Sequence, residues 1–137
     1  MKSRRITISH PRKKEPVLWV IDSEQWPRAC LSAEWIERGY DPYGFITISD
    51  ALDSLSRGAW AKPEAIILEL REQNLTSELV ESIRNLRIPT VVLCGASVLI
   101  YPLILHEKWD VVLKRPVSLG KIADVVQQIV SKQRMAV

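Results

Sequence analysis

The sequence lacks most of the patterns that identify a particular chemistry. It has only two cysteines, Cys30 and Cys94, and no Cys-x-x-Cys pair or Cys/His cluster, which argues against a disulfide framework and a zinc site. No G-x-G-x-x-G or Walker sequence is present, so dinucleotide and nucleotide phosphate sites have no support. The apolar run at 98–105 is far shorter than the roughly 18 residues of a membrane span. We therefore expect a reduced, cytoplasmic protein with no metal, no cofactor and no membrane segment.

Acidic residues are absent from the start of the chain, which has no apolar stretch of the kind found in a signal peptide. The remainder carries more acidic than basic side chains, so this short arm sets the net charge of +3. We expect a solvated arm at 1–15 and one globular domain at 16–134. The arm could instead contact nucleic acid or an acidic partner, although no aromatic residue is interleaved in it to stack on bases. Its basic residues are Lys2, Arg4, Arg5, Arg12, Lys13 and Lys14.

Five short apolar runs alternate with segments of helical periodicity. Strands that alternate with helices are typical of βαβ crossovers and a parallel sheet. The sequence therefore predicts a flavodoxin-like three-layer α/β/α sandwich, with a five-stranded parallel sheet in the order 2-1-3-4-5. Ser49 and Ser118 are the expected N-caps of two helices. Strands are expected at 16–22, 43–49, 65–70, 88–96 and 110–116, and helices at 23–40, 49–60, 76–86, 97–109 and 118–133.

The first expected helix has an apolar stripe at helical spacing. We expect this stripe to face the core, and Cys30 with it. Its members are Trp26, Ala29, Cys30, Ala33 and Ile36.

Charged and polar side chains follow the expected strands at the edge where ligands bind in such a sheet. Glu69 is the most telling of them, because an apolar strand has no packing reason to end in an acid. We expect these residues to share one crevice at the carboxyl ends of the strands. They are Asp22, Ser23, Glu69, Arg71, Cys94 and Arg115.

This layout resembles the receiver domain of bacterial two-component response regulators over about residues 16 to 132. Pro63, Pro89 and Pro116 stand at matching distances from the site positions. The resemblance implies an acidic pair that holds Mg²⁺, an aspartate that accepts a phosphoryl group, a Thr or Ser that senses it, and a lysine before proline that pairs with it. It also implies a response regulator's place in two-component signal transduction or a phosphorelay.

The chain departs from that pattern at most of these positions. Ser23 replaces the second acid, Glu69 the phosphoacceptor aspartate, Cys94 the Thr or Ser, and Arg115 the lysine. Arg71 stands where the family offers a backbone carbonyl to the metal, so its side chain could enter the pocket. Mg²⁺ requires close octahedral oxygen ligands, and a misplacement of about 1 Å can cost roughly 10²-fold in rate. We expect a degenerate site in a non-enzymatic pseudo-receiver, with Glu69 paired to Arg115 or Arg71.

Two alternatives remain at this stage: a receiver that is still phosphorylated with Mg²⁺, and a nucleic-acid accessory protein that uses the basic arm. For the degenerate module we expect a protein partner. A homodimer through the fourth helix and the fifth strand is one option, because the uncharged run beside Pro102 favours an interface. The expected interface residues are Val98, Leu99, Ile100, Tyr101, Leu103, Ile104 and Leu105.

Overall fold

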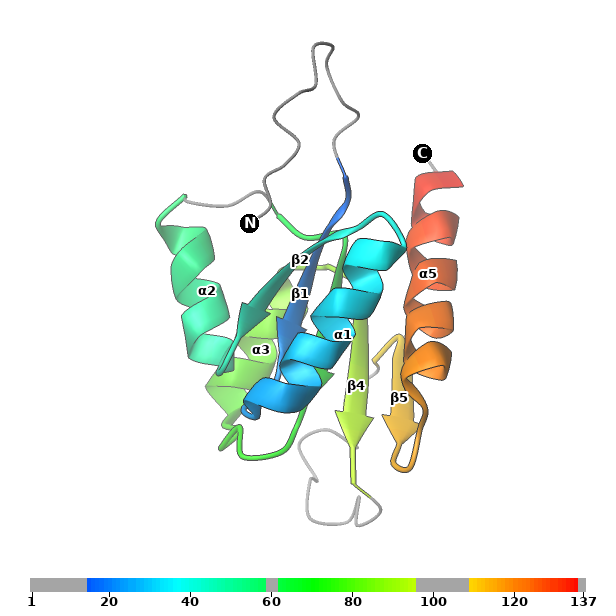
Figure 1. The fold of residues 1–137 in the computed structure, drawn as a ribbon. Helices are drawn as coiled ribbons and strands as arrows, with labels where there is room; N and C mark the ends of the chain where they lie inside the picture. Colours follow the sequence, from blue (N-terminus) through cyan, green and yellow to red (C-terminus); the bar gives the residue numbers. More distant parts are fainter. Residues whose placement is uncertain (1–14, 59–61, 96–108, 136–137) are drawn as a thin grey trace, which may run out of the picture.

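The computed structural model describes residues 15–58, 62–95 and 109–135. Its five strands form one parallel sheet in the order β2-β1-β3-β4-β5, which confirms the predicted fold class (Figure 1). From β1 to β4 a helix lies between each strand and the next, as the crossovers of a parallel sheet require, and residues 96–108 between β4 and β5 are outside the described ranges. The elements are β1 (Val17–Ile21), α1 (Gln25–Glu37), β2 (Asp41–Phe45), α2 (Ile48–Ser56), β3 (Ala65–Glu69), α3 (Ser77–Asn85), β4 (Thr90–Cys94), β5 (Val111–Lys114) and α5 (Leu119–Met135).

Helices cover both faces of the sheet. Every residue of β1, β3 and β4 is buried, which explains why these segments read as continuous apolar runs. Successive side chains of β1 alternate between two cores: Leu18 packs in the core beneath α1 and α5, and Trp19 in the one beneath α2 and α3. The loops that follow the strands lie at the carboxyl edge of the sheet, between the two helical layers.

The expected boundaries are wrong around the second strand. β2 begins at Asp41 and ends at Phe45, so it lies earlier than predicted, and α2 begins at Ile48. The cap of α2 is Thr47, whose hydroxyl accepts a hydrogen bond from the Asp50 amide at 3.1 Å, and not Ser49. Threonine is also a good N-cap, but the prediction considered only Ser49. The predicted cap of the last helix is confirmed, since Ser118 accepts from the Lys121 amide at 3.1 Å.

The expected inner face of α1 is also wrong. The helix packs on the sheet through Leu31 and Trp35, which are 5% and 0% exposed. Trp26 and Ile36 are 78% and 63% exposed, and Cys30 is only partly buried. Both faces of the helix are apolar, and the Leu31/Trp35 pair is the one that fills the core. The stripe predicted to face inward therefore faces outward.

Three predictions fall outside the described residues, apart from Glu15 and Trp109: the basic arm at 1–15, the helix at 97–109 and the apolar interface at 98–105. Within the described ranges, no helix is long and apolar enough to span a bilayer.

Candidate functional site

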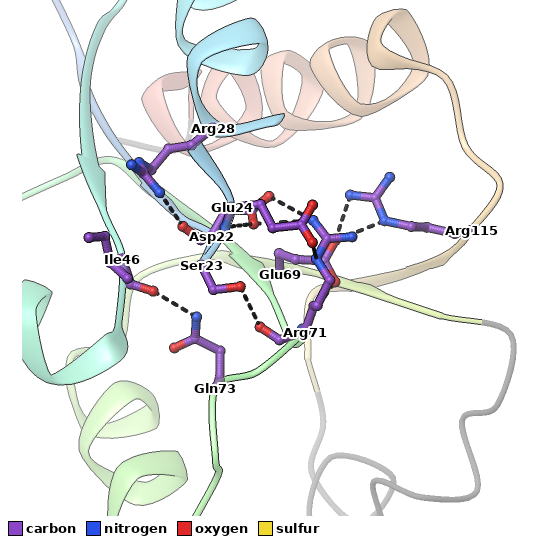
Figure 2. Close-up of polar contacts among 9 residues, drawn as sticks. All are labelled: Asp22, Ser23, Glu24, Arg28, Ile46, Glu69, Arg71, Gln73 and Arg115. Carbon is purple, nitrogen blue, oxygen red and sulfur yellow. Dashed lines mark hydrogen bonds and ion pairs between the residues drawn. The ribbon is translucent and has the colours of Figure 1, made fainter. Parts of the chain in front are cut away.

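The loops that follow β1, β3 and β5 meet at the carboxyl edge of the sheet and form a crevice of paired charges (Figure 2). Two of its carboxylates are almost inaccessible to solvent: Asp22 is 4% exposed and Glu69 is 2% exposed. A buried carboxylate is costly unless it is paired or hydrogen-bonded. The partners of these two acids therefore determine what the crevice can bind.

Glu69 is held by Arg115. The Nε and Nη2 atoms of Arg115 lie 2.8 and 2.5 Å from Oε1 of Glu69, so two N–H donors of one guanidinium converge on one oxygen. The other carboxylate oxygen, Oε2, accepts a hydrogen bond from the backbone amide of Arg71 at 3.2 Å. Both oxygens of Glu69 are thus engaged inside the chain. Of the two arginines that the sequence offered as partners, the side chain that pairs with Glu69 is Arg115.

The Arg71 side chain turns toward the β1 loop instead. Its Nη2 lies 3.2 and 3.4 Å from the two carboxylate oxygens of Asp22, and its Nε lies 3.3 Å from Oε2 of Glu24, an ionic contact without hydrogen-bond geometry. Burial alone would lower the pKa of Arg71, but the negative charges of Glu69, Asp22 and Glu24 raise it. The guanidinium is therefore a permanent positive charge in the centre of the crevice.

Ser23 closes the position that the receiver resemblance assigns to a metal ligand. Its hydroxyl donates a hydrogen bond of 3.1 Å to the backbone carbonyl of Arg71, the oxygen that the resemblance gives to Mg²⁺. Asp22 is already shared between Arg71 and the Glu24 amide, which donates to its Oδ1 at 2.9 Å. No group of three or more potential metal-ligating side chains occurs in the part of the chain that the structure describes. The residues present do not fit a Mg²⁺ ion.

Cys94 ends β4 and is buried, with its sulfur 3.9 Å from the Leu113 carbonyl. Burial raises the pKa of this thiol, and the charge of Glu69 raises it further, against smaller lowering contributions from Lys114 and Arg115. A nucleophilic cysteine needs a lowered pKa. The geometry therefore supports a neutral packing thiol that offers only a weak hydrogen bond.

Gln73 is the structural residue that sequence reasoning missed. Its buried carboxamide donates to the Ile46 carbonyl at 2.9 Å and accepts from the Ile48 amide at 3.1 Å, so it ties the β3–α3 loop to the start of α2 (Figure 2). Its neighbours Glu72 and Asn74 have φ of 59° and 50°, which is unfavourable for a glutamate in particular. The loop keeps this backbone because Gln73 anchors it from the inside. No local sequence signal marks such a long-range contact.

Arg28 is a second residue absent from the predicted site. Its Nη1 donates to the backbone carbonyl of Asp22 at 2.7 Å and holds the β1 loop from the α1 side. Its aliphatic stem lies against Gly44 of β2, where a Cβ would approach Cδ of Arg28 to 3.2 Å. A glycine on the edge strand therefore gives the arginine room to reach the loop.

The arrangement of the sheet and helices matches that of solved structures. The fold is that of a response regulator receiver domain. A CheY-like receiver domain from Methanospirillum hungatei JF-1 superposes with a TM-score of 0.76 at 14% identity, over 90% of this chain and 100% of that one. A receiver domain from Clostridium thermocellum gives 0.73 at 13% identity, over 89% and 99%. A response regulator receiver protein from Pseudomonas putida gives 0.71 at 24% identity, over 85% and 99%.

The likeness is one of structure. No protein-family model matches the chain, and no curated protein matches it at a significant level. At these identities the receiver fold is established, while the chemistry of the crevice must be argued from its own residues.

Proposed function

We propose that this chain is a signalling module of the receiver type that does not transfer a phosphoryl group, and that it acts through contact with another protein. One observation carries the proposal: the two buried carboxylates of the crevice are already neutralised by arginines of the same chain. Arg115 binds Glu69 and Arg71 binds Asp22. The receiver fold supplies the class of module, and the ion pairs indicate how it differs from a switch.

The Arg71 guanidinium argues against metal-assisted chemistry at this position. A divalent cation would have to displace this guanidinium from Asp22. It would also find a serine at position 23, where the receiver pattern has a carboxylate ligand. Mg²⁺ gives up its water reluctantly and is bound through anionic oxygens in near-octahedral geometry. A serine hydroxyl that donates to the Arg71 carbonyl offers no such oxygen.

Glu69 is also poorly placed to accept a phosphoryl group. A nucleophile needs a free lone pair aimed at phosphorus, and misplacement by about 1 Å can cost roughly 10²-fold in rate. One oxygen of Glu69 accepts two hydrogen bonds from Arg115, and the other accepts one from the Arg71 amide. Attack by Oε1 would require the ion pair to open first, and Oε2 keeps only one lone pair that is not already engaged.

A module with such a crevice has one electrostatic state. Its output is then set by whether and where a partner binds, and not by a covalent mark. We infer that the chain presents a constant receiver-like surface. With this surface it would occupy a site on a partner protein that a phosphorylated relative also binds.

The test is to incubate the intact chain with Mg²⁺ and a small acyl phosphate and then to measure its mass. We expect no change. A matched variant, Ser23→Asp/Glu69→Asp/Arg71→Ala, restores the receiver pattern at three positions and should gain Mg²⁺-dependent labelling. A stable phosphate adduct mapped to Glu69 of the unmodified chain would refute the proposal, as would a beryllofluoride adduct there.

A further inference from the structure

The outer face of α1 is apolar although nothing described in the structure covers it. Helix α1 packs beside α5 on one side of the sheet, and its inner face is occupied by Leu31 and Trp35 (Figure 1). The face that points away from the sheet exposes Trp26, Ala29, Ala33 and Ile36. Trp26 and Ile36 are the two most exposed large apolar side chains in the described part of the chain.

The spacing of the stripe is that of a helix-pairing seam. Positions 26, 29, 33 and 36 follow the alternating steps of three and four residues that a coiled-coil seam uses at its a and d positions. Two small alanines lie in the middle, which allows a second helix to approach closely, and a large side chain lies at each end. The seam spans about 15 Å along the helix.

The seam is also complementary to itself when a second copy is turned antiparallel. In a two-fold pair centred on position 31, Trp26 of one copy meets Ile36 of the other, and Ala29 meets Ala33. Each layer then joins an a position to a d position, and large packs against large while small packs against small. An isologous two-fold contact requires this kind of self-match, and a surface evolved for an unrelated partner does not.

We propose that the outer face of α1 is a homodimer surface on which two copies pair as antiparallel helices. The layout is different from the predicted interface at 98–105 and uses none of the crevice residues. A monomeric chain would therefore leave the crevice proposal intact, and a phosphorylated crevice would leave the dimer intact.

The expected affinity is modest because the seam is short. If Trp26 buries about 150 Å² and Ile36 about half as much, two copies remove about 450 Å² of apolar surface from water. Stable interfaces bury about 800 Å² on each partner, so we expect a dissociation constant of about 10 μM or weaker. The dimer would respond to local concentration, for example when two copies are recruited to one place.

Sedimentation of the full chain over a concentration series up to about 1 mM tests the pairing in this affinity range. We expect reversible dimers, and an at least about tenfold weaker dissociation constant for Trp26→Glu and for Ala33→Glu. Trp26 is 78% exposed, so its replacement leaves the core intact. The matched control is Val112→Glu, which puts the same charge at an exposed apolar residue of β5. A chain that stays monomeric throughout, or a dimer abolished by Val112→Glu and untouched at α1, would overturn the proposal.

Disulfide trapping tests the direction of the helices. In a Cys30→Ser background, chains with Ala29→Cys are mixed with chains carrying Ala33→Cys and oxidised. The antiparallel pair predicts that the mixed disulfide forms faster than the disulfide of either variant with itself. Preferential self-disulfides would show a parallel pair and refute the geometry.

Discussion

The free energy of unfolding of an Arg115→Ala variant should show how strongly the buried charge of Glu69 depends on Arg115. Glu69 is 2% exposed in the parent chain, and in Arg115→Ala it keeps only the backbone amide of Arg71 as a donor. Loss of one partner of a buried ion pair leaves an uncompensated charge in a region of low dielectric constant. The resulting penalty is much larger than the net contribution of the pair itself.

The expected loss of folding free energy is about 2–3 kcal/mol. Fully buried pairs lose about 3–5 kcal/mol when one partner is removed, and the lower figure applies here because the Arg115 side chain is 31% exposed and partly screened by water. For a domain of this size, about 1 kcal/mol corresponds to about 3 °C in the melting temperature. Arg115→Ala should therefore melt about 6–9 °C below the parent chain.

Urea unfolding and thermal melts measure the loss, and the chain contains a matched control. Arg57 forms an ion pair with Asp53 at 2.7 Å, but the two side chains are 73% and 57% exposed. Arg57→Ala should cost about 0.5 kcal/mol or less, because exposed pairs contribute little. The double variant Arg115→Ala/Glu69→Gln should recover part of the loss, since position 69 then carries no buried charge without its partner. Equal costs for Arg115→Ala and Arg57→Ala would refute the assignment of Arg115 as the essential partner of Glu69.

Two further predictions concern side chains beside the crevice. Gln73→Ala should cost about 2–3 kcal/mol in urea unfolding, because it leaves the Ile46 carbonyl and the Ile48 amide without their partner, and an unchanged midpoint would contradict the anchoring role. Thiol reagents at mildly alkaline pH should modify Cys30 in the folded chain and Cys94 only after unfolding, as mapped by peptide mass, and rapid native labelling of Cys94 would contradict its burial. The raised pKa of Cys94 means that the folded thiol keeps its proton where the unfolded one has lost it. Its contribution to stability should therefore be present below the ordinary thiol pKa and decline as pH rises above it, relative to Cys94→Ala.

The fold was predictable because three of its strands have a clear apolar pattern in the sequence. β1, β3 and β4 are buried on both faces, and no surface requirement interrupts their apolar runs. The edge strand β2 was harder to place. Its residues are only partly buried and include Pro42 and Gly44, so burial imposes no clear pattern on them. The helix that follows had two acceptable caps, Thr47 and Ser49, and only the path of the chain decides between them.

The position of the crevice was predictable, but the pairing of its acids with its arginines was not. Parallel strands place their carboxyl ends at one edge, so Asp22, Glu69 and Arg115 had to be neighbours. Which arginine meets which acid depends on side-chain rotamers and loop paths that a linear pattern does not encode. The same holds for Gln73, whose partners lie in a different loop.

The outer face of α1 shows why periodicity alone can mislead. The helix has two apolar stripes, and the sequence gives the longer one, from Trp26 to Ile36, more weight than the pair Leu31 and Trp35. The Leu31/Trp35 pair faces the core, because a leucine and a tryptophan on one side fill the space above the sheet that the two alanines of the other stripe would leave empty. A second apolar stripe on a helix that already has a core face is a reason to look for a partner.

The crevice combines two effects that would separately leave a receiver able to switch. An arginine that neutralises Glu69 could still swing away if a metal drew the loop open, because the Arg115 side chain is 31% exposed. The β1 loop, however, is held at the same time by Arg71 on Asp22 and by Arg28 on the Asp22 carbonyl. To admit a cation the chain must break contacts from two different elements and bring a divalent charge toward a guanidinium that its acids keep protonated. On our proposal, it is the sum of these costs, and no single substitution, that makes one charge state the stable one.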